Sequence, residues 1–386
     1  MVSRITGVGE APVVIRVGMV GASPDYGWGS GVHRRVIERL PGYTLQGVCT
    51  TREESAREAA ARFGAPLWFT DAEVLAQHPD IDLVAICVKV PHHHAIARAA
   101  LNAGKHIYCE WPLAISVEQA EELAALARRR GVKAMIGLHL RGSPVMTHAA
   151  NLVAEGYVGR LYSVTLHARI FGPVMRAMAM RAGGTTLLSI YGGHLIDAMD
   201  HHFGPIEDVD VRGAIHLPPV DENGAPIDRD ADDHLLFEGR LRGGALFQMN
   251  LAGVSMSGMG CEWRIEGSEG SLLLSTRDPS LPAIESLVLH GVRGGGAMEP
   301  IAIPSALECA AIPAEPDRYS AYPGSFASRE ALSSIGNLYT RLGEAIVNDA
   351  AVEPDFDRAA AIQNLLARLD GASSPRACAQ AAGVTP

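Results

Sequence analysis

The stretch that decides the fold runs from Ile81 to Leu113 and reads IDLVAICVKVPHHHAIARAALNAGKHIYCEWPL. It opens with an apolar run, Leu83 to Val88, that lacks polar alternation and so predicts a strand covered on both faces of a parallel sheet. A helix over Ala95 to Ala103 follows, Gly104 ends it, and Ile107 to Cys109 predicts the next strand. Ligands of open α/β sheets bind beyond the carboxyl ends of the strands, so we expect the turns after these two strands to line one crevice.

Length and composition narrow the class of protein. A chain of 386 residues with 47% hydrophobic and 20% charged residues suits a globular protein of two domains. The net charge of -10 argues against nucleic acid or an anionic membrane as partner and favours a small molecule or a protein. The six cysteines lack C-x-x-C spacing, which predicts reduced thiols and no metal site. With no signal peptide and no long apolar segment in the sequence, we expect a cytoplasmic protein without a membrane span.

Upstream, the run from Val13 to Val20 predicts a first buried strand that leads into a glycine-rich loop and a helix over Val32 to Arg39. This order allows backbone N–H groups at a helix N-terminus to approach a pyrophosphate. The spacing departs from G-x-G-x-x-G, so a simple turn explains the loop as well. The loop supplies four candidate cofactor-binding residues: Gly21, Ser23, Gly27 and Trp28.

The second strand, Leu45 to Cys49, ends just before two further candidates, Thr50 and Arg52. An acid at this point of a dinucleotide fold meets the ribose 2′-OH of NAD, whereas an arginine accommodates a 2′-phosphate. Arg52 and the neighbouring hydroxyls therefore favour NADP, with NAD possible. A solvated arginine at the start of a helix is the alternative.

The remaining pattern divides the chain at residue 138. Helices over 53–63, 71–78 and 116–130 and a strand over 134–138 complete a Rossmann dinucleotide-binding domain, residues 1–138. Residues 139–386 predict an α+β domain with a large, mostly antiparallel open sheet, in which a one-side-buried strand, two hairpins and two C-terminal helices alternate with loops. One such loop, 171–188, is predicted to lie over the crevice. The strands, hairpins and helices span 161–170, 235–251, 261–274, 332–347 and 356–369.

Several of these segments resemble the Gfo/Idh/MocA oxidoreductase family, and within it the branch of the fungal galactose-pathway repressor. The likeness lies in the V-P-x-H turn, the A-G-K-H-I-Y-C-E-W-P-L run and a G-x-H-x-x-D stretch over 192–197. It implies a nicotinamide cofactor and an open sheet that often mediates oligomers, here a homodimer or homotetramer. It also implies five more cofactor-binding residues: Val90, Pro91, His93, Glu110 and Trp111.

The chain departs from the family at its usual catalytic residues. Most family dehydrogenases have E-K-P where this chain has Glu110-Trp111-Pro112, and their lysine assists proton transfer, which an indole cannot do. The acid usually found four residues before the signature histidine is Ile190, so only His194 of that trio remains. We therefore expect His194 to handle the proton, with Tyr191 and His139 as secondary donors. A structural histidine is the alternative for His194.

Three functions fit these residues. The first is an NAD(P)-dependent oxidoreductase that transfers hydride at a CH–OH group of a sugar, cyclitol or related polyol. The second is a non-catalytic NAD(P)-binding regulator, which the missing lysine supports. The third is a redox-neutral lyase or hydrolase that uses tightly held NAD. The first is the prediction because the remaining histidine supplies what proton transfer requires.

Overall fold

The computed structural model describes residues 13–25, 27–171, 175, 178–221, 223–255, 260–276, 287–312, 319–322, 325–327 and 329–372. The first layer is a six-stranded parallel sheet in the order β3-β2-β1-β4-β5-β6, and the order reverses between β1 and β4. This is the doubly wound arrangement in which the two central strands create the binding edge. Its strands are β1 (Ile15–Val20), β2 (Tyr43–Cys49), β3 (Leu67–Phe69), β4 (Leu83–Ile86), β5 (His106–Glu110) and β6 (Ala134–Gly137).

Helices connect these strands on both faces of the sheet, as a right-handed series of crossovers requires. The helix predicted over 32–39 starts earlier, with a π-helical turn at Gly29–His33 that continues into α1 (Arg34–Arg39). The early start brings Gly29 against the end of β1, where an added Cβ would lie 3.0 Å from Gly21 O. The other helices are α2 (Glu53–Phe63), α3 (Ala72–Gln77), α4 (His93–Asn102) and α5 (Val117–Arg130).

The second layer is an eight-stranded sheet in the order β14-β13-β12-β11-β7-β10-β9-β8. Every neighbouring pair is antiparallel except β10 and β7, which run parallel. The predicted fold class is therefore confirmed, including both hairpins. Its strands are β7 (Leu161–Phe171), β8 (Ile206–Ala214), β9 (His234–Leu241), β10 (Leu246–Ser255), β11 (Gly260–Gly267), β12 (Gly270–Thr276), β13 (Leu287–Arg293) and β14 (Glu299–Pro300).

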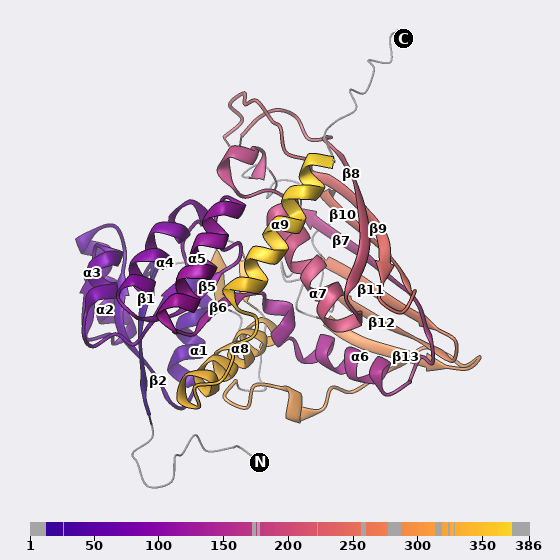
Figure 1. The fold of residues 1–386 in the computed structure, drawn as a ribbon, viewed down its shortest axis with the longest axis horizontal. Helices are drawn as coiled ribbons and strands as arrows, with labels where there is room; N and C mark the ends of the chain where they lie inside the picture. Colours follow the sequence, from indigo (N-terminus) through magenta and orange to yellow (C-terminus); the bar gives the residue numbers. More distant parts are fainter. Residues whose placement is uncertain are drawn as a thin grey trace.

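Four helices join the two layers: α6 (Pro144–Ala154), α7 (Gly193–Phe203), α8 (Arg329–Val347) and α9 (Phe356–Ala372). Figure 1 shows α9 between α5 of the first layer and α7 of the second, and α8 returning beneath the first layer beside α1. One hydrophobic core lies between the first sheet, α1, α2 and α8. A second core extends from the opposite face of that sheet through α5 and α9 to the inner face of the large sheet. The boundary at residues 138/139 stays a prediction, and helices from beyond it complete the packing of the first layer.

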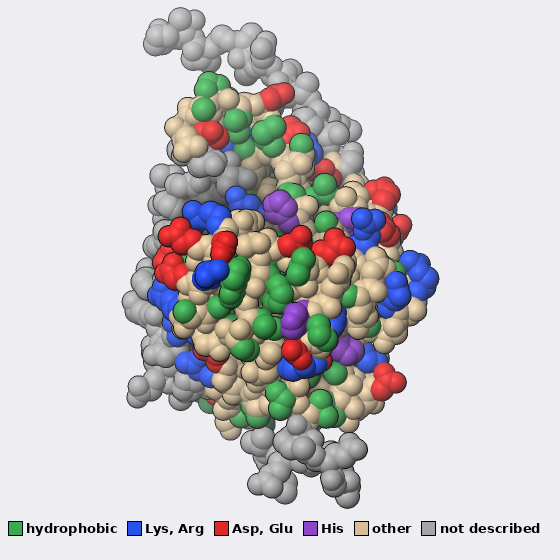
Figure 2. Space-filling model, turned by 90° about the vertical axis from the view of Figure 1, so that its left-hand side faces the viewer, with side chains coloured by type: hydrophobic (Ala, Val, Ile, Leu, Met, Phe, Trp, Pro, Cys, Tyr) green, Lys and Arg blue, Asp and Glu red, His purple; other side chains and the backbone are tan. Residues whose placement is uncertain are grey.

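Both layers expose charged and apolar side chains. On the face of the first layer in Figure 2, acidic and basic side chains are interspersed. The outer face of the large sheet carries exposed apolar side chains among polar ones, including Leu246 at 53% and Leu236 at 42% exposure. Among the described residues, no helix combines the length and hydropathy that a membrane crossing needs.

Candidate functional site

The glycine-rich loop passes directly over the end of β4. Gly21 has φ +96°, and an added Cβ would lie 2.2 Å from Cys87 O, so only glycine fits there. Gly27 also has a positive φ of +122°. The Ser30 hydroxyl donates to Ser23 O and ties the loop to the helix that follows. The loop therefore runs close along the edge where the strand order reverses, as the approach of a backbone to a pyrophosphate requires.

The turn after β2 places Thr50 and Arg52 at the same edge of the sheet. Thr50 Oγ1 donates to Arg52 O at 3.0 Å and lies 2.7 Å from Ser55 Oγ, so it fixes the backbone at the start of α2. The Arg52 side chain is exposed. The acidic neighbour Glu53 pairs with Arg57 at 2.6 Å. A phosphate near Arg52 would therefore meet a Glu53 carboxylate already engaged with another cation.

The V-P-x-H turn lies between the ends of β4 and β5. Val90 is buried, whereas Pro91 is exposed. His93 is 1% exposed, with Nδ1 2.7 Å from Pro112 O and Nε2 2.9 Å from Val88 O. Burial lowers the pKa of His93, and the two carbonyl oxygens act in the opposite direction. His93 thus ties the two turns together, and its contact with a cofactor stays a prediction.

Glu110, at the end of β5, is the centre of a buried polar cluster. Its Oε1 lies 2.9 Å from His33 Nε2, and its Oε2 lies 3.0 Å from His139 Nε2. Burial alone would raise the pKa of Glu110, but His139 and His33 outweigh it and hold the pKa well below its ordinary value. An added Cβ at Gly137 would lie 2.7 Å from Glu110 Oε1, so the glycine at the end of β6 makes room for the carboxylate.

His139 lies at the meeting point of the predicted cofactor and catalytic residues. Its ring stacks on Trp28 of the glycine-rich loop, with centroids 5.4 Å apart and planes at 17°. On another side it contacts the ring of His194, with centroids 5.0 Å apart. His194 comes from the first turn of α7, in the second layer, and is 9% exposed. The structure therefore brings His139, His194, Glu110 and Trp28 together from four separate elements.

Trp111 fills the position of the usual lysine as a fixed contact between the layers. It is 5% exposed, and its Nε1 donates to Ser189 O at 2.8 Å. An added Cβ at Gly193 would lie 2.4 Å from Trp111 Cζ2, so α7 packs directly on the indole. The single N–H of Trp111 is thus used within the chain, and the ring forms a wall 6.4 Å from His194 between ring centroids.

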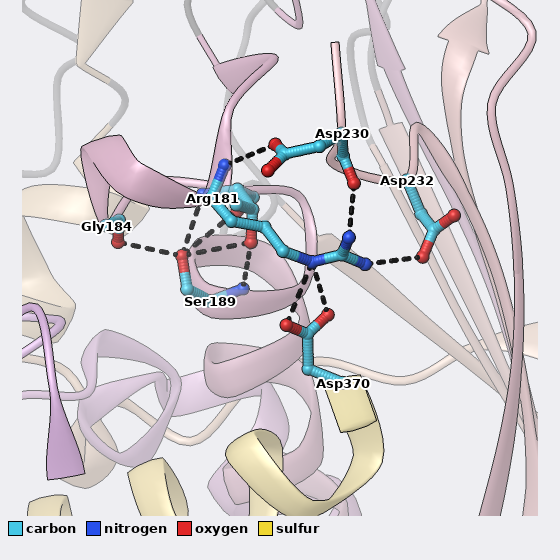
Figure 3. Close-up of polar contacts among 7 residues, drawn as sticks. Arg181, Gly184, Ser189, Asp230, Asp232 and Asp370 are labelled. Carbon is cyan, nitrogen blue, oxygen red and sulfur yellow. Dashed lines mark hydrogen bonds and ion pairs between the residues drawn. The ribbon is translucent and has the colours of Figure 1, made fainter. Parts of the chain in front are cut away.

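The segment that receives the Trp111 hydrogen bond is anchored by Arg181 (Figure 3). Arg181 Nε lies 3.1 and 3.0 Å from the two carboxylate oxygens of Asp370 on α9, and the Arg181 backbone N–H donates to Asp230 Oδ1 at 2.7 Å. Nearby, Ser189 Oγ accepts from the Thr186 backbone N–H at 2.8 Å. Residues 178–188 therefore form a folded strap with a 3₁₀ turn at Arg181–Gly183, where a plain loop was predicted. The loop's residues 172–174, 176 and 177 lie outside the described part of the chain.

Asp197 of the G-x-H-x-x-D stretch serves the contact between helices. It is 1% exposed, accepts from Arg141 Nε and Nη2, each at 2.8 Å, and accepts from Arg358 Nε at 2.7 Å. Tyr191, in the π-helical turn Leu188–Gly192 that leads into α7, is half-buried and packs on the core. Within the described ranges, no cluster of His, Cys, Asp and Glu has the grouping of a metal site.

Two residues of the site were not among the predicted ones. His33 is fully buried and joins Glu110 to the hydroxyl of Tyr339, which lies 2.9 Å from His33 Nδ1. Tyr339 lies on α8, 306 positions further along the chain. The periodic apolar pattern around Tyr339 predicted a helix, but nothing in that pattern indicated which side chain would reach the first layer.

Fold and site together define a dinucleotide-binding α/β protein with a second, open-sheet domain. Residues 15–138 match the family model described as the oxidoreductase family with an NAD-binding Rossmann fold, and residues 144–276 match the Gal80p C-terminal domain. These two matches, together with the similarity to GAL80 proteins, support the Gfo/Idh/MocA oxidoreductase family, near its Gal80 branch.

Individual relatives include both enzymes and regulators. Dehydrogenase aclE of Aspergillus oryzae is 35% identical over 48% of this chain and 54% of its own length. The galactose/lactose metabolism regulatory protein GAL80 of Kluyveromyces lactis is 29% identical over 60% of this chain and 56% of its own length. The chain thus spans little more than half the length of these curated relatives. Levoglucosan dehydrogenase in complex with NADH and levoglucosan shares the fold, with a TM-score of 0.77 and 19% identity over 93% of this chain and 97% of that one.

Proposed function

We propose that the protein is an NAD(P)-dependent oxidoreductase that acts at a CH–OH group of a sugar, cyclitol or related polyol. The observation that carries the proposal is the convergence of His139, Glu110 and His194 at the edge of the Rossmann sheet, beside the glycine-rich loop. An enzyme of this class needs a group that exchanges a proton with the substrate hydroxyl while hydride is transferred. The relatives named as dehydrogenases agree with this class.

The residues around the glycine-rich loop fit a bound dinucleotide. Gly21 leaves the space that a Cβ would fill, as a close approach of a phosphate requires. Trp28 Nε1 is buried and has no hydrogen-bond partner within the described ranges, so an acceptor on a bound ligand would satisfy it. Gly21, Ser23, Gly27, Trp28, Val90 and Pro91 would hold the cofactor, which supplies or accepts hydride when bound.

A histidine is the candidate group for proton exchange with the substrate hydroxyl, because the indole N–H of Trp111 is already donated to Ser189 O. His194 faces the site from α7, and His139 faces it from the end of β6 with a carboxylate behind its ring. We propose His194 as the residue that exchanges the proton, with His139 and Tyr191 as further donors. Glu110 acts through His139 by orienting its ring.

The test is turnover of a polyol panel by the purified protein with NADP⁺ and NAD⁺, followed as reduced cofactor at 340 nm. We expect turnover of at least one panel member and a loss of about 100-fold or more in His194→Ala. The matched control is His201→Ala on the same helix, an exposed histidine at which we expect no loss. Cofactor binding without turnover would favour the non-catalytic NAD(P)-binding regulator, an alternative that the similarity to GAL80 supports. Cofactor that co-purifies and never exchanges would favour the redox-neutral lyase or hydrolase.

We propose NADP as the preferred cofactor, with NAD possible, because Arg52 follows β2 with its side chain exposed. Arg52→Ala should weaken NADPH binding about 10-fold or more while NADH binding stays within twofold, since only NADPH carries the 2′-phosphate. The control is Arg57→Ala, one turn further along α2, which removes an equal charge from the Glu53 pair. Equal weakening of both cofactors in Arg52→Ala would contradict the preference.

We also propose a homodimer or homotetramer formed through the outer face of the large sheet. Leu246 and Leu236 are exposed on that face. Leu246 also lines a groove there, together with Ser163, Thr165 and Gln248 and the carboxylates of Asp208, Asp210 and Glu238. Light scattering should give a multiple of 40.9 kDa, and Leu246→Asp should shift the protein toward the monomer. A monomer in the unaltered protein would refute the assembly.

A further inference from the structure

Charged side chains on the outer face of the large sheet lie in rows that cross the strands. The first row consists of successive cross-strand partners: Glu238 on β9, Gln248 on β10, Thr165 on β7 and Arg264 on β11. The second row, two residues away along each strand, consists of Arg240, Leu246, Ser163 and Glu266. Each row therefore has an acid at one end, a base at the other and uncharged side chains between them. The acid and the base exchange ends from one row to the next.

The charges at the two ends of the first row are poorly matched within one copy of the chain. Glu238 lies directly opposite Asp210 of β8, and like charges at opposed positions of antiparallel strands are destabilising. Both carboxylates line the groove on this face, which has a volume of about 350 Å³. The Arg264 side chain is 45% exposed and reaches Glu262 and Glu266 at 3.9 and 3.7 Å, beyond hydrogen-bond length. An acidic groove and a loosely held guanidinium thus lie three strands apart on one face.

The geometry of face-to-face packing decides which charges meet. Two copies of a sheet that pack face to face are related by a two-fold axis that lies between the sheets and parallel to them. An axis along the strands, midway between β10 and β7, places β9 over β11 of the partner and keeps each row opposite itself. Glu238 then faces Arg264 of the partner subunit. Arg240 likewise faces Glu266 of the partner subunit, so both rows become complementary.

An axis across the strands gives the opposite result. If it follows the first row, each strand lies over the same strand of the partner. Glu238 then faces Glu238 of the partner subunit, and Arg264 faces Arg264 of the partner subunit. Like charges brought together in an interface are strongly unfavourable, so the charge pattern favours the axis along the strands.

We propose that this face binds a second copy of the chain with the two-fold axis along the strands, and that Arg264 of each copy enters the acidic groove of the other. A guanidinium suits this groove because its planar set of N–H donors can bond the carboxylates of both Glu238 and Asp210. The inference rests on the proposed assembly, whose copies it orients, and is independent of the proposed activity.

Charge reversal in the full chain tests the contact, with the Kd of self-association measured by analytical ultracentrifugation. Glu238→Arg and Arg264→Glu each set like charges against one another twice per dimer, so we expect each to raise the Kd about 100-fold or more. The combination of both changes restores opposite charges and should recover at least about tenfold of that loss. An unchanged Kd in both single variants would overturn the proposal.

The matched control is Glu262→Arg, the same change of charge on the same face. Its cross-strand partners place it two strands from Asn250 and three from Leu236, so with the axis along the strands it faces Leu236 of the partner subunit. We expect no weakening of association in this variant. With the axis across the strands Glu262 would face Glu266 of the partner subunit, and tighter association in Glu262→Arg would then contradict the proposal.

A distance measurement keeps the test independent of these charges. Leu273 on β12 continues the first row beyond Arg264. With the axis along the strands, it lies over β8 of the partner, five strand spacings or about 24 Å sideways from Leu273 of the partner subunit. Nitroxide labels on Leu273→Cys, compared with the labelled unaltered protein, should therefore give an electron–electron distance of about 25 Å or more. With the axis across the strands the two labels would face each other across the roughly 10 Å between packed sheets.

The results separate the orientation from the assembly. A dimer that gives the short distance would overturn the orientation and leave the proposed assembly. A monomer at every concentration would overturn both. The polyol assay is read independently, since none of these residues lies in the site at the edge of the Rossmann sheet.

Discussion

Gly193 is the residue at which α7 packs on Trp111, and it has no room for a side chain. A Cβ there would lie 2.4 Å from the indole, which cannot turn away without losing its hydrogen bond to Ser189 O. We predict that Gly193→Ala lowers the free energy of unfolding by about 1–3 kcal/mol, as overpacking of a filled contact does. Urea unfolding of the purified variant measures this loss.

Two further variants show whether the indole causes the loss. At Gly183 the nearest atom to an added Cβ is Thr185 Oγ1 at 3.9 Å, so Gly183→Ala should be neutral or slightly stabilising. Trp111→Phe removes the atoms that the new Cβ would meet, so its combination with Gly193→Ala should cost less than the two changes added together. Strict additivity would mean that the clash is relieved elsewhere.

At the scale of elements, Asp197 is the carboxylate that holds α7 to the turn after β6 and to α9. Burial alone would raise its pKa, but Arg141 and Arg358 outweigh this effect and lower the pKa below the ordinary value of 3.8. Asp197→Asn leaves two guanidinium groups without their shared anion and should cost about 3–5 kcal/mol at pH 7. In Glu53→Gln, which breaks an exposed pair, we expect a loss of at most about 1 kcal/mol.

Because the Asp197 carboxylate titrates, the difference in stability between the unaltered protein and Asp197→Asn should depend on pH. A group whose pKa is lowered by folding stabilises the native state above its unfolded pKa, and this contribution is lost as pH falls through the folded pKa. The stability gap between the unaltered protein and Asp197→Asn should therefore be full at pH 7 and shrink below about pH 4. Urea unfolding at steps between pH 7 and pH 3 measures it, and a constant gap would contradict the ion-pair assignment.

Elements with local signals were predictable from the sequence. The helix at Glu53–Phe63 has the predicted bounds and ends at Gly64, whose φ is +68°. The helix at Val117–Arg130 begins where Ser116 Oγ accepts from Gln119 N at 3.3 Å and ends before Gly131 in the left-handed region. The residues that cap such a helix lie next to it in the sequence. The local sequence pattern is therefore sufficient to predict where the helix begins and ends.

The missed features depend on contacts between distant parts of the chain. The π-helical turn at Gly29–His33 accompanies the packing of Gly29 against the ends of β1 and β4. The hydrogen bond between Tyr339 and His33 exists because α8 returns to the first layer. The sequence predicted α8 as a helix and Glu110 and His139 as site residues, but helical periodicity does not specify which sheet a helix covers. Their roles in the site stay predictions.

At the scale of the whole molecule, α8 completes the core of the first layer. Five of its side chains are at most 3% exposed within the core that also holds β1 and α1: Leu332, Ile335, Leu338, Tyr339 and Leu342. Their burial contributes on the order of 10 kcal/mol, which is comparable to the entire stability of an ordinary domain.

A fragment of residues 1–142 should therefore lack a cooperative thermal transition and bind the dye ANS. A second fragment, in which a flexible Gly/Ser linker joins residues 1–142 to 329–372, should regain a cooperative transition, because the linker restores α8 without the large sheet. Cooperative unfolding of 1–142 alone would show that the first layer folds autonomously up to the predicted boundary at 138/139. Failure of both fragments would show that the first layer also depends on the large sheet, through the core that α5 and α9 share with it.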